Sequence, residues 1–401
     1  MRAEKPFGFH RVVSQQVSLG LRLTIPIVTP TSIFAAPPPP QAEVPFPLEW
    51  LLNHAAPPIQ YRAINEVARL NVAGSPGLSM LPLAHRPALE LAIQADVHGV
   101  WNGSMLSIPS SRSEHFEGVG TIPAIRRLLE YGWDRDSSPI VHSKRLLFRL
   151  LAEDNDPAQL WELRPTKGKH EDEFLRGQRQ LLREAAGATL AQAGFESDPR
   201  LRGLARRTIE RIQEFLHSPL AEKPWVRIGN RQVLHPEAFP PSIYALHLIA
   251  HMPLFQSEHY EAMELLYAYL SRPLPRQESI QQIGTQLLPV PYAVLGDHLP
   301  HRNAVEDDVP KALAWLDLIA RLGFLRRSEH WTKMYERFID DCGRDGVWHP
   351  HKGLAMPKSS DPYVWPIFPL EVPHTGEERW SDVTFRIGLI ARLSGRPVTL
   401  I

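Results

Sequence analysis

Three stretches of this sequence end a helix and turn the chain in the same way. In each, an apolar helical run is followed by a glycine and then an aromatic residue, at Gly132-Trp133, Gly194-Phe195 and Gly323-Phe324. Glycine adopts the left-handed conformation that ends a helix, and the residue after it packs back on the last helical turn. The chain is therefore expected to consist of repeated helical hairpins.

The residues around these turns support the same prediction. The expected packing partners of the three aromatics are Leu128, Leu190 and Ile319, all apolar. The second helix of each hairpin is expected to start at a capping residue, and the candidates are Ser138, Asp198 and Ser328. Ser and Asp satisfy the free N–H groups of a helix start.

Helical periodicity extends the pattern along the chain and predicts an all-α fold. The expected hairpins are 59–71 with 83–97, 119–131 with 139–153, 172–193 with 199–217, 241–252 with 257–271 and 310–322 with 329–342, followed by a last helix at 378–394. Short β-hairpins are expected only in connectors, for example 226–228 with 232–234 around Gly229-Asn230.

A second repeated signature carries a family resemblance. The segments 91–101 (LAIQADVHGVW) and 338–348 (FIDDCGRDGVW) both close a helix with Gly-Val-Trp, and the first keeps a glutamine, Gln94. This pattern resembles the glutamine–tryptophan motif of the squalene-cyclase and prenyltransferase superfamily, including bacterial members. The resemblance covers residues 45–401 and implies an α/α toroid, in which an inner ring of helices is enclosed by an outer ring.

The chemistry of that family does not follow from the resemblance. The Asp-x-Asp-Asp acid of terpene cyclases is absent, and the nearest string, Asp134-Arg135-Asp136-Ser137, lies in a hairpin turn. Asp340, Cys342 and His374 match the spacing of the prenyltransferase zinc ligands, but Asp340 and Cys342 come at the end of an expected outer helix. Zinc is therefore disfavoured, and the sequence names no cofactor.

The first 44 residues are expected to form a flexible, proline-rich arm. Residues 17–36 are apolar and outline a secretory signal, but Arg22, Pro26 and Pro30 interrupt the run. No uncharged apolar run is long enough to span a membrane. A cytoplasmic location is predicted, and the single cysteine, Cys342, is compatible with a reducing compartment. Lys and Arg together number 44, as do Asp and Glu, and this balance argues against nucleic-acid binding.

The densest polar loop supplies the first candidates for chemistry. It contains Asp297, His298 and His301, and a carboxylate beside a histidine suits a general base with its orienting partner. Glu237 lies just before an expected inner helix and is a further catalytic candidate. The alternative interpretation is that these histidines lie on a solvated loop and that Asp307 or Asp308 caps the next helix.

Candidate ligand-binding residues lie on one helix and after the second Gly-Val-Trp. Tyr244, His247 and His251 share a helix, and the two histidines, four residues apart, project from one face. No third metal ligand accompanies them, so two interior histidines are favoured over a metal site. A second group suits a sugar or a flat apolar ligand, although packing explains it equally: His349, His351 and Trp365.

Three functions remain open at this point. The first is a toroid whose central cavity binds, and can process, a small or extended ligand such as an isoprenoid or carbohydrate. The second is a non-catalytic helical-repeat scaffold that binds another protein; it predicts a filled centre and an exposed apolar surface. The third is a polysaccharide lyase or glycoside hydrolase, which requires Tyr244 and Glu237 to face one cleft.

Overall fold

A computed structural model describes residues 43–71, 74–110, 115–152, 171–301, 304–349, 361–371 and 381–401; within 171–176 it describes the backbone only. All of these residues belong to one compact unit, Ala42–Ile401. The expected arm, residues 1–44, lies outside the described residues except for its last two positions, as do His351 and His374.

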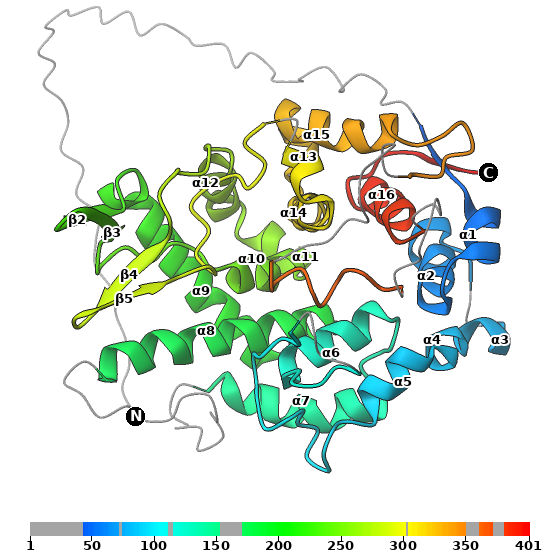
Figure 1. Cartoon of the computed structure of the whole chain (residues 1–401), viewed down its shortest axis with the longest axis horizontal. Helices are drawn as coiled ribbons and strands as arrows, with labels where there is room; N and C mark the ends of the chain where they lie inside the picture. The colour runs from blue at the N-terminus through cyan, green and yellow to red at the C-terminus, as the bar shows by residue number, and fades with distance from the viewer. Residues whose placement is uncertain are drawn as a thin grey trace, which may run out of the picture. The chain divides into compact units, whose positions relative to one another are not determined.

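The described part of the chain is mostly helical, as the periodicity predicts (Figure 1). Up to residue 192 the helices are α1 (Leu48–His54), α2 (Pro57–Arg62), the π-helix η1 (Ala63–Ala68), α3 (Pro76–Ser79), α4 (Leu81–Ala84), α5 (Arg86–Ala92), α6 (Thr121–Glu130), α7 (Ser138–Leu150) and α8 (Glu171–Gln192). They continue with α9 (Pro199–His217), η2 (Pro219–Ala221), α10 (Ile243–Ala250), α11 (Pro253–Glu258), α12 (Tyr260–Leu270), α13 (Ala304–Asp307), α14 (Val309–Arg321), η3 (Leu325–Arg327), α15 (Glu329–Asp340) and α16 (Ser381–Leu393).

The three glycine turns have the predicted geometry. Gly132, Gly194 and Gly323 have φ of +87°, +83° and +76°. The aromatic residue after each glycine donates its backbone N–H to the carbonyl of the residue that was expected to pack against it. These hydrogen bonds run from Trp133 to Leu128, from Phe195 to Leu190 and from Phe324 to Ile319. A fourth turn of this kind ends α16 at Gly395, which has φ +71° but no aromatic residue after it.

The predicted caps are confirmed at two of the three helices. Asp198 and Ser328 accept hydrogen bonds from the N–H groups of Arg200 and Trp331. Ser138 instead lies inside α7, whose N-cap is Ser137. The side chain of Asp308 accepts the N–H of Lys311 and caps α14, which is one of the two alternatives that the sequence leaves open.

The two Gly-Val-Trp loops make equivalent contacts. Trp101 and Trp348 are both buried. The backbone N–H of Trp101 donates to the Thr121 hydroxyl at the start of α6, and that of Trp348 donates to the Thr384 hydroxyl near the start of α16. Each loop is thus attached to the first turn of the long helix that follows it, α6 or α16.

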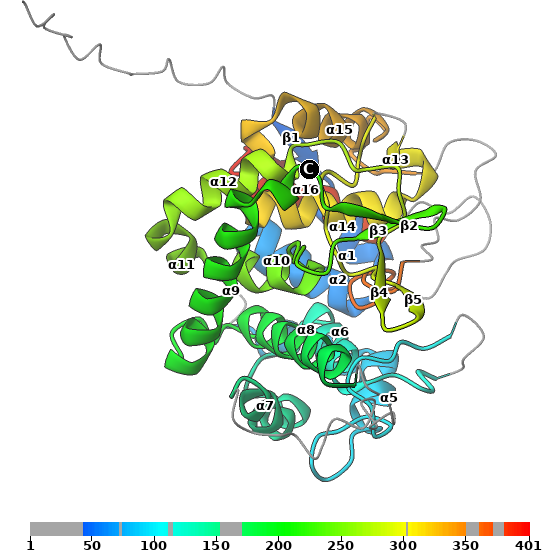
Figure 2. The ribbon, with the colours of Figure 1, turned by 90° about the vertical axis from the view of Figure 1, so that its left-hand side faces the viewer.

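Six helical segments form a continuous series of contacts. The α2–η1 segment contacts α16, α16 contacts α14, α14 contacts α10, α10 contacts α8 and α8 contacts α6 (Figure 1). A buried ion pair between Arg62 of α2 and Glu130 of α6 joins the first of these to the last. The remaining long helices lie outside them, with α7 and α9 on α8, α12 on α9 and α15 on α16 (Figure 2).

The sheets are small but more extensive than expected. The predicted hairpin forms β2 (Trp225–Ile228) and β3 (Arg231–Leu234). A second hairpin, β4 (Ile280–Ile283) with β5 (Gln286–Pro289), joins it through a parallel β3–β4 pairing. β1 (Val44–Phe46) pairs in parallel with β6 (Val398–Leu400), and thereby joins the two ends of the compact unit.

An irregular segment, residues 361–371, runs between the six inner segments (Figure 1, orange). Arg127 of α6 donates to the carbonyls of Trp365 and Pro369, and Arg386 of α16 donates to that of Ile367. Asp382 accepts the N–H of Leu370. These contacts hold the segment against α6 and α16.

Candidate functional site

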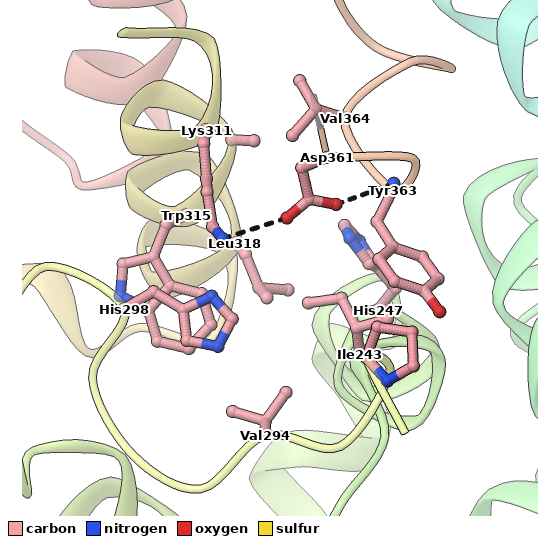
Figure 3. Close-up of a pocket in the computed structure, with 12 residues that line it drawn as sticks. Ile243, His247, Val294, His298, Lys311, Trp315, Leu318, Asp361, Tyr363 and Val364 are labelled. Carbon is pink, nitrogen blue, oxygen red and sulfur yellow. Dashed lines mark hydrogen bonds and ion pairs between the residues drawn. The ribbon is translucent and has the colours of Figure 1, made fainter. Parts of the chain in front are cut away.

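A pocket lies between α10, α14, residues 291–298 and the start of segment 361–371 (Figure 3). Its volume is about 70 Å³. Both apolar and polar side chains line it: Ile243, His247, Pro291, Val294, His298, Lys311, Ala314, Trp315, Leu318, Asp361, Tyr363 and Val364. Four separate stretches of sequence thus contribute to one site.

Lys311 and Asp361 form an ion pair on one wall of the pocket. Lys311 Nζ lies 3.2 Å from Asp361 Oδ2, and Asp361 Oδ1 accepts the N–H of Tyr363 at 2.9 Å (Figure 3). The Lys311 side chain is 40% exposed, whereas that of Asp361 is 19% exposed. This wall therefore offers charge beside the apolar lining, at the side where solvent reaches the pocket.

His298 and Trp315 form a stacked pair beside Lys311 in the pocket lining (Figure 3). Their ring centroids are 4.4 Å apart and the ring planes differ by 9° (Figure 3). Burial, assisted by the positive charge of Lys311, lowers the pKa of His298 to about 4. His298 is therefore a neutral imidazole at pH 7, which donates or accepts hydrogen bonds but takes up a proton only weakly.

His247 faces the pocket from α10, and His251 lies one turn further along. The two rings are stacked with centroids 6.0 Å apart, and His251 Nδ1 donates to the carbonyl of His247 at 2.9 Å. Burial lowers the pKa of His247 well below its usual value and that of His251 to about 4. Among the described residues, no group of three or more His, Cys, Asp or Glu side chains is placed to hold a metal ion.

Tyr244 does not line the pocket but packs against Tyr363, which does. Its ring packs edge-on against that of Tyr363, with centroids 5.4 Å apart, and burial raises its pKa to about 12. Tyr244 is therefore a neutral phenol. Glu237 is exposed and does not line the pocket, so the structure does not bring these two residues together there.

Asp297 is buried and lies behind the pocket wall. Its Oδ1 accepts from Trp315 Nε1 at 2.8 Å and from the Leu299 N–H at 3.0 Å, and its Oδ2 accepts from Trp331 Nε1 at 2.8 Å. His330 Nε2 lies 3.3 Å from Oδ2. These contacts hold Trp315 in position, so Asp297 orients a pocket residue rather than lining the pocket.

The other sequence candidates lie elsewhere. His301 and His349 are exposed, and His351 is outside the described residues. Trp365 is half-buried, with the Arg127 guanidinium 5.3 Å from its ring centroid, and it also packs edge-on against Phe116. Cys342 donates to the Phe338 carbonyl, and burial raises its pKa to about 12.

Lys311, Trp315, Asp361 and Tyr363 are pocket residues that the sequence analysis did not select. Lys311 and Trp315 are four residues apart near the start of α14, a spacing that places them on one helix face. That spacing is a weak signal, because any amphipathic helix shows it. Asp361 and Tyr363 lie in an irregular segment, where no periodicity indicates their direction.

No protein-family model, curated protein or solved structure matches this chain. No helix in the described part of the chain is both long and apolar enough to cross a membrane. The geometry of the pocket is therefore the basis for a functional proposal.

Proposed function

We propose that the protein is an α/α toroid that binds a small organic molecule in the pocket between α10 and α14. The sequential contacts of the six inner segments support a closed ring, as do the equivalent Trp–Thr contacts of the two Gly-Val-Trp loops. The observation that carries the binding proposal is the meeting of two neutral histidines, two aromatic rings and a Lys–Asp pair from four segments in one pocket.

The size of the pocket favours a compact ligand. Sites for drug-sized molecules have volumes of roughly 300–1,000 Å³. With segment 361–371 in place, a volume of about 70 Å³ accommodates a few heavy atoms rather than an isoprenoid chain or an oligosaccharide. The stacked His298–Trp315 pair offers a flat apolar surface, and Lys311, Asp361 and His247 offer polar partners.

Binding is a better supported role than catalysis. A general base works best when its pKa lies near the operating pH. The pKa of His298 is about 4, and the oxygens of Asp297 are occupied by hydrogen bonds from the two indoles. These groups suit recognition through hydrogen bonds and stacking.

The test is a screen of small polar fragments by ligand-observed NMR. It is repeated with two variants, in each of which an alanine is replaced by phenylalanine. Ala314 lines the pocket, and Ala314→Phe is expected to fill it and abolish fragment binding. Ala268 is exposed on α12, so Ala268→Phe is the matched control and is expected to bind as the wild type does. The proposal fails if no fragment binds the wild type, or if the same fragments bind the Ala314→Phe variant equally well.

A scaffold function has its own supporting observation. Apolar side chains are exposed on and near α3–α5, most strongly Ile93 (80%) and Val97 (86%), and also Met80, Leu83 and Leu89. Exposed apolar groups of this kind mark interaction surfaces. If this function holds, purification from native extract retains one stoichiometric protein partner, which Ile93→Asp removes and Ala314→Phe does not. A chain that is recovered alone contradicts it.

A further inference from the structure

His247, in the pocket lining, has a ring nitrogen without a hydrogen bond. The residue is 7% exposed, and its Nδ1 is a buried atom with no hydrogen-bond partner in the part of the chain that the structure describes. His251 differs, because its Nδ1 donates to the His247 carbonyl at 2.9 Å. A buried polar atom that stays unpaired is costly. Since His247 lines the pocket, a molecule bound there can supply the missing partner.

The charges in the pocket lining compensate one another. Among the described residues that line it, Lys311 carries the positive charge and Asp361 the negative charge, and the two pair at 3.2 Å. Burial lowers the pKa of His298 to about 4 and that of His247 well below its usual value, so both rings are neutral at pH 7. Burial also raises the pKa of Tyr363, which keeps its phenol neutral. An ionic ligand would therefore lose its hydration without gaining an unpaired counter-charge from this lining.

The size and shape of the pocket suit a small planar group. Its volume is about 70 Å³, whereas a closed apolar cavity of roughly 150 Å³ accommodates benzene. A group of about four heavy atoms is therefore the expected size. The stacked rings of His298 and Trp315 are flat surfaces in the lining. A carboxamide is planar and offers both an N–H donor and a C=O acceptor, so it can pair with His247 Nδ1 in either tautomer of that ring.

We propose that the pocket binds an uncharged planar amide, whose carboxamide group hydrogen-bonds Nδ1 of His247 and lies against the His298–Trp315 pair. This inference rests on the proposed function of the pocket and narrows it to one class of ligand. The Lys311–Asp361 pair then contributes polarity to the lining without selecting an ion of either sign.

The experiment titrates the full chain with acetate, acetamide and acetamidinium at pH 7 and equal ionic strength. The three compounds share one planar skeleton and are negative, neutral and positive, respectively. Acetamide is expected to bind at least about tenfold more tightly than either ion, because the neutral lining does not replace the hydration that an ion loses. Equal or tighter binding of either ion overturns the inference.

Side-chain ¹⁵N NMR of the histidine-labelled wild type reports on the hydrogen bond directly. Acetamide is expected to shift the Nδ1 resonance of His247 as the pocket fills, because that atom gains a partner. Acetamide binding that leaves this resonance unchanged overturns the inference. The measurement needs no variant, so it decides the question even where a substitution prevents folding.

Substitutions at two successive histidines isolate the hydrogen bond. His247→Phe keeps a ring without nitrogen and is expected to weaken acetamide binding about fivefold or more. His247→Asn places an amide near the position of Nδ1 and is expected to restore part of the affinity. His251→Phe is the matched control, since His251 is outside the pocket lining, and it is expected to bind acetamide as the wild type does. Equal losses in the two Phe variants contradict a specific role for His247.

The outcomes also separate this inference from the proposed function. If all three compounds bind equally and Ala314→Phe blocks them all, the pocket binds small molecules but does not select an uncharged amide. If other fragments bind in the pocket and acetamide does not, the inference fails and the proposed function stands. If Ala314→Phe leaves acetamide binding unchanged, acetamide binds outside the pocket and both proposals fail.

Discussion

Four histidines inside the protein differ from ordinary surface histidines because burial disfavours their charged form. The pKa values of His298, His251 and His85 are lowered from 6.5 to about 4, and that of His247 is lowered further. Desolvation is the largest cause in each case, and neighbouring cations add to it.

This difference predicts acid sensitivity. A group whose pKa is lower in the folded state binds fewer protons there than in the unfolded chain, so stability is complete above about pH 6.5 and falls as the pH drops towards 4. The free energy of unfolding is expected to decrease by up to about 3 kcal/mol over this range for each histidine whose pKa is lowered to about 4. Urea unfolding at a series of pH values measures it.

The control uses histidines in different settings. His251→Gln is expected to flatten the pH dependence, whereas His217→Gln, at an exposed position on α9, is expected to leave it unchanged. A pH profile that is the same for wild type and His251→Gln contradicts this account.

At the scale of the element, the glycine turns have equal local geometry but different surroundings. A Cβ added at Gly323 meets no atom within 4 Å, whereas one added at Gly132 lies 2.8 Å from Tyr61 Cδ1 and 3.1 Å from Pro82 Cγ. Both glycines have positive φ, which disfavours any L side chain.

Alanine substitutions at the two glycines are therefore expected to lower the free energy of unfolding by different amounts. Gly323→Ala is expected to lower the free energy of unfolding by about 1 kcal/mol, the conformational cost alone. Gly132→Ala is expected to cost roughly 1–3 kcal/mol more, because the end of α6 must move away from α2 and α4. Denaturant titration of the two variants measures the difference, and equal losses would argue against this packing.

At the scale of the whole molecule, Glu130 connects helices that are distant in sequence. It accepts hydrogen bonds from Arg62 of α2, Arg386 of α16 and Gln192 of α8. Burial opposes its charge, but Arg62, Arg386 and Arg321 hold its pKa well below the usual value. The Glu130 carboxylate therefore links α6 to α2, α8 and α16.

Removing this charge is expected to weaken the whole assembly. Glu130→Gln removes a buried carboxylate that Arg62 and Arg386 share and is expected to cost about 3–5 kcal/mol. Glu66, which pairs with Arg62 but is 32% exposed, is the control, and Glu66→Gln is expected to cost less than about 1 kcal/mol. Calorimetric unfolding compares them, and similar losses would show that the network around Glu130 contributes little.

The sequence predicts the hairpins and their turns because these depend on neighbours along the chain. The hydrogen bonds that end α6, α8 and α14 span at most five residues, and the caps at Asp198 and Ser328 are equally local. The parallel pairings were missed, because Leu234 with Gln281, or Val44 with Val398, come together only when the helices between them have packed.

By itself, the sequence determined the three glycine turns that end α6, α8 and α14 and the caps at Asp198 and Ser328. It also identified His247, His298 and Tyr244 among the residues in or next to the pocket. Only the tertiary structure decided that Lys311, Asp361 and Tyr363 join them, and that Asp297 binds two indoles. Local backbone geometry is encoded within a few residues. The partners of a buried charge come from helices tens to hundreds of residues away.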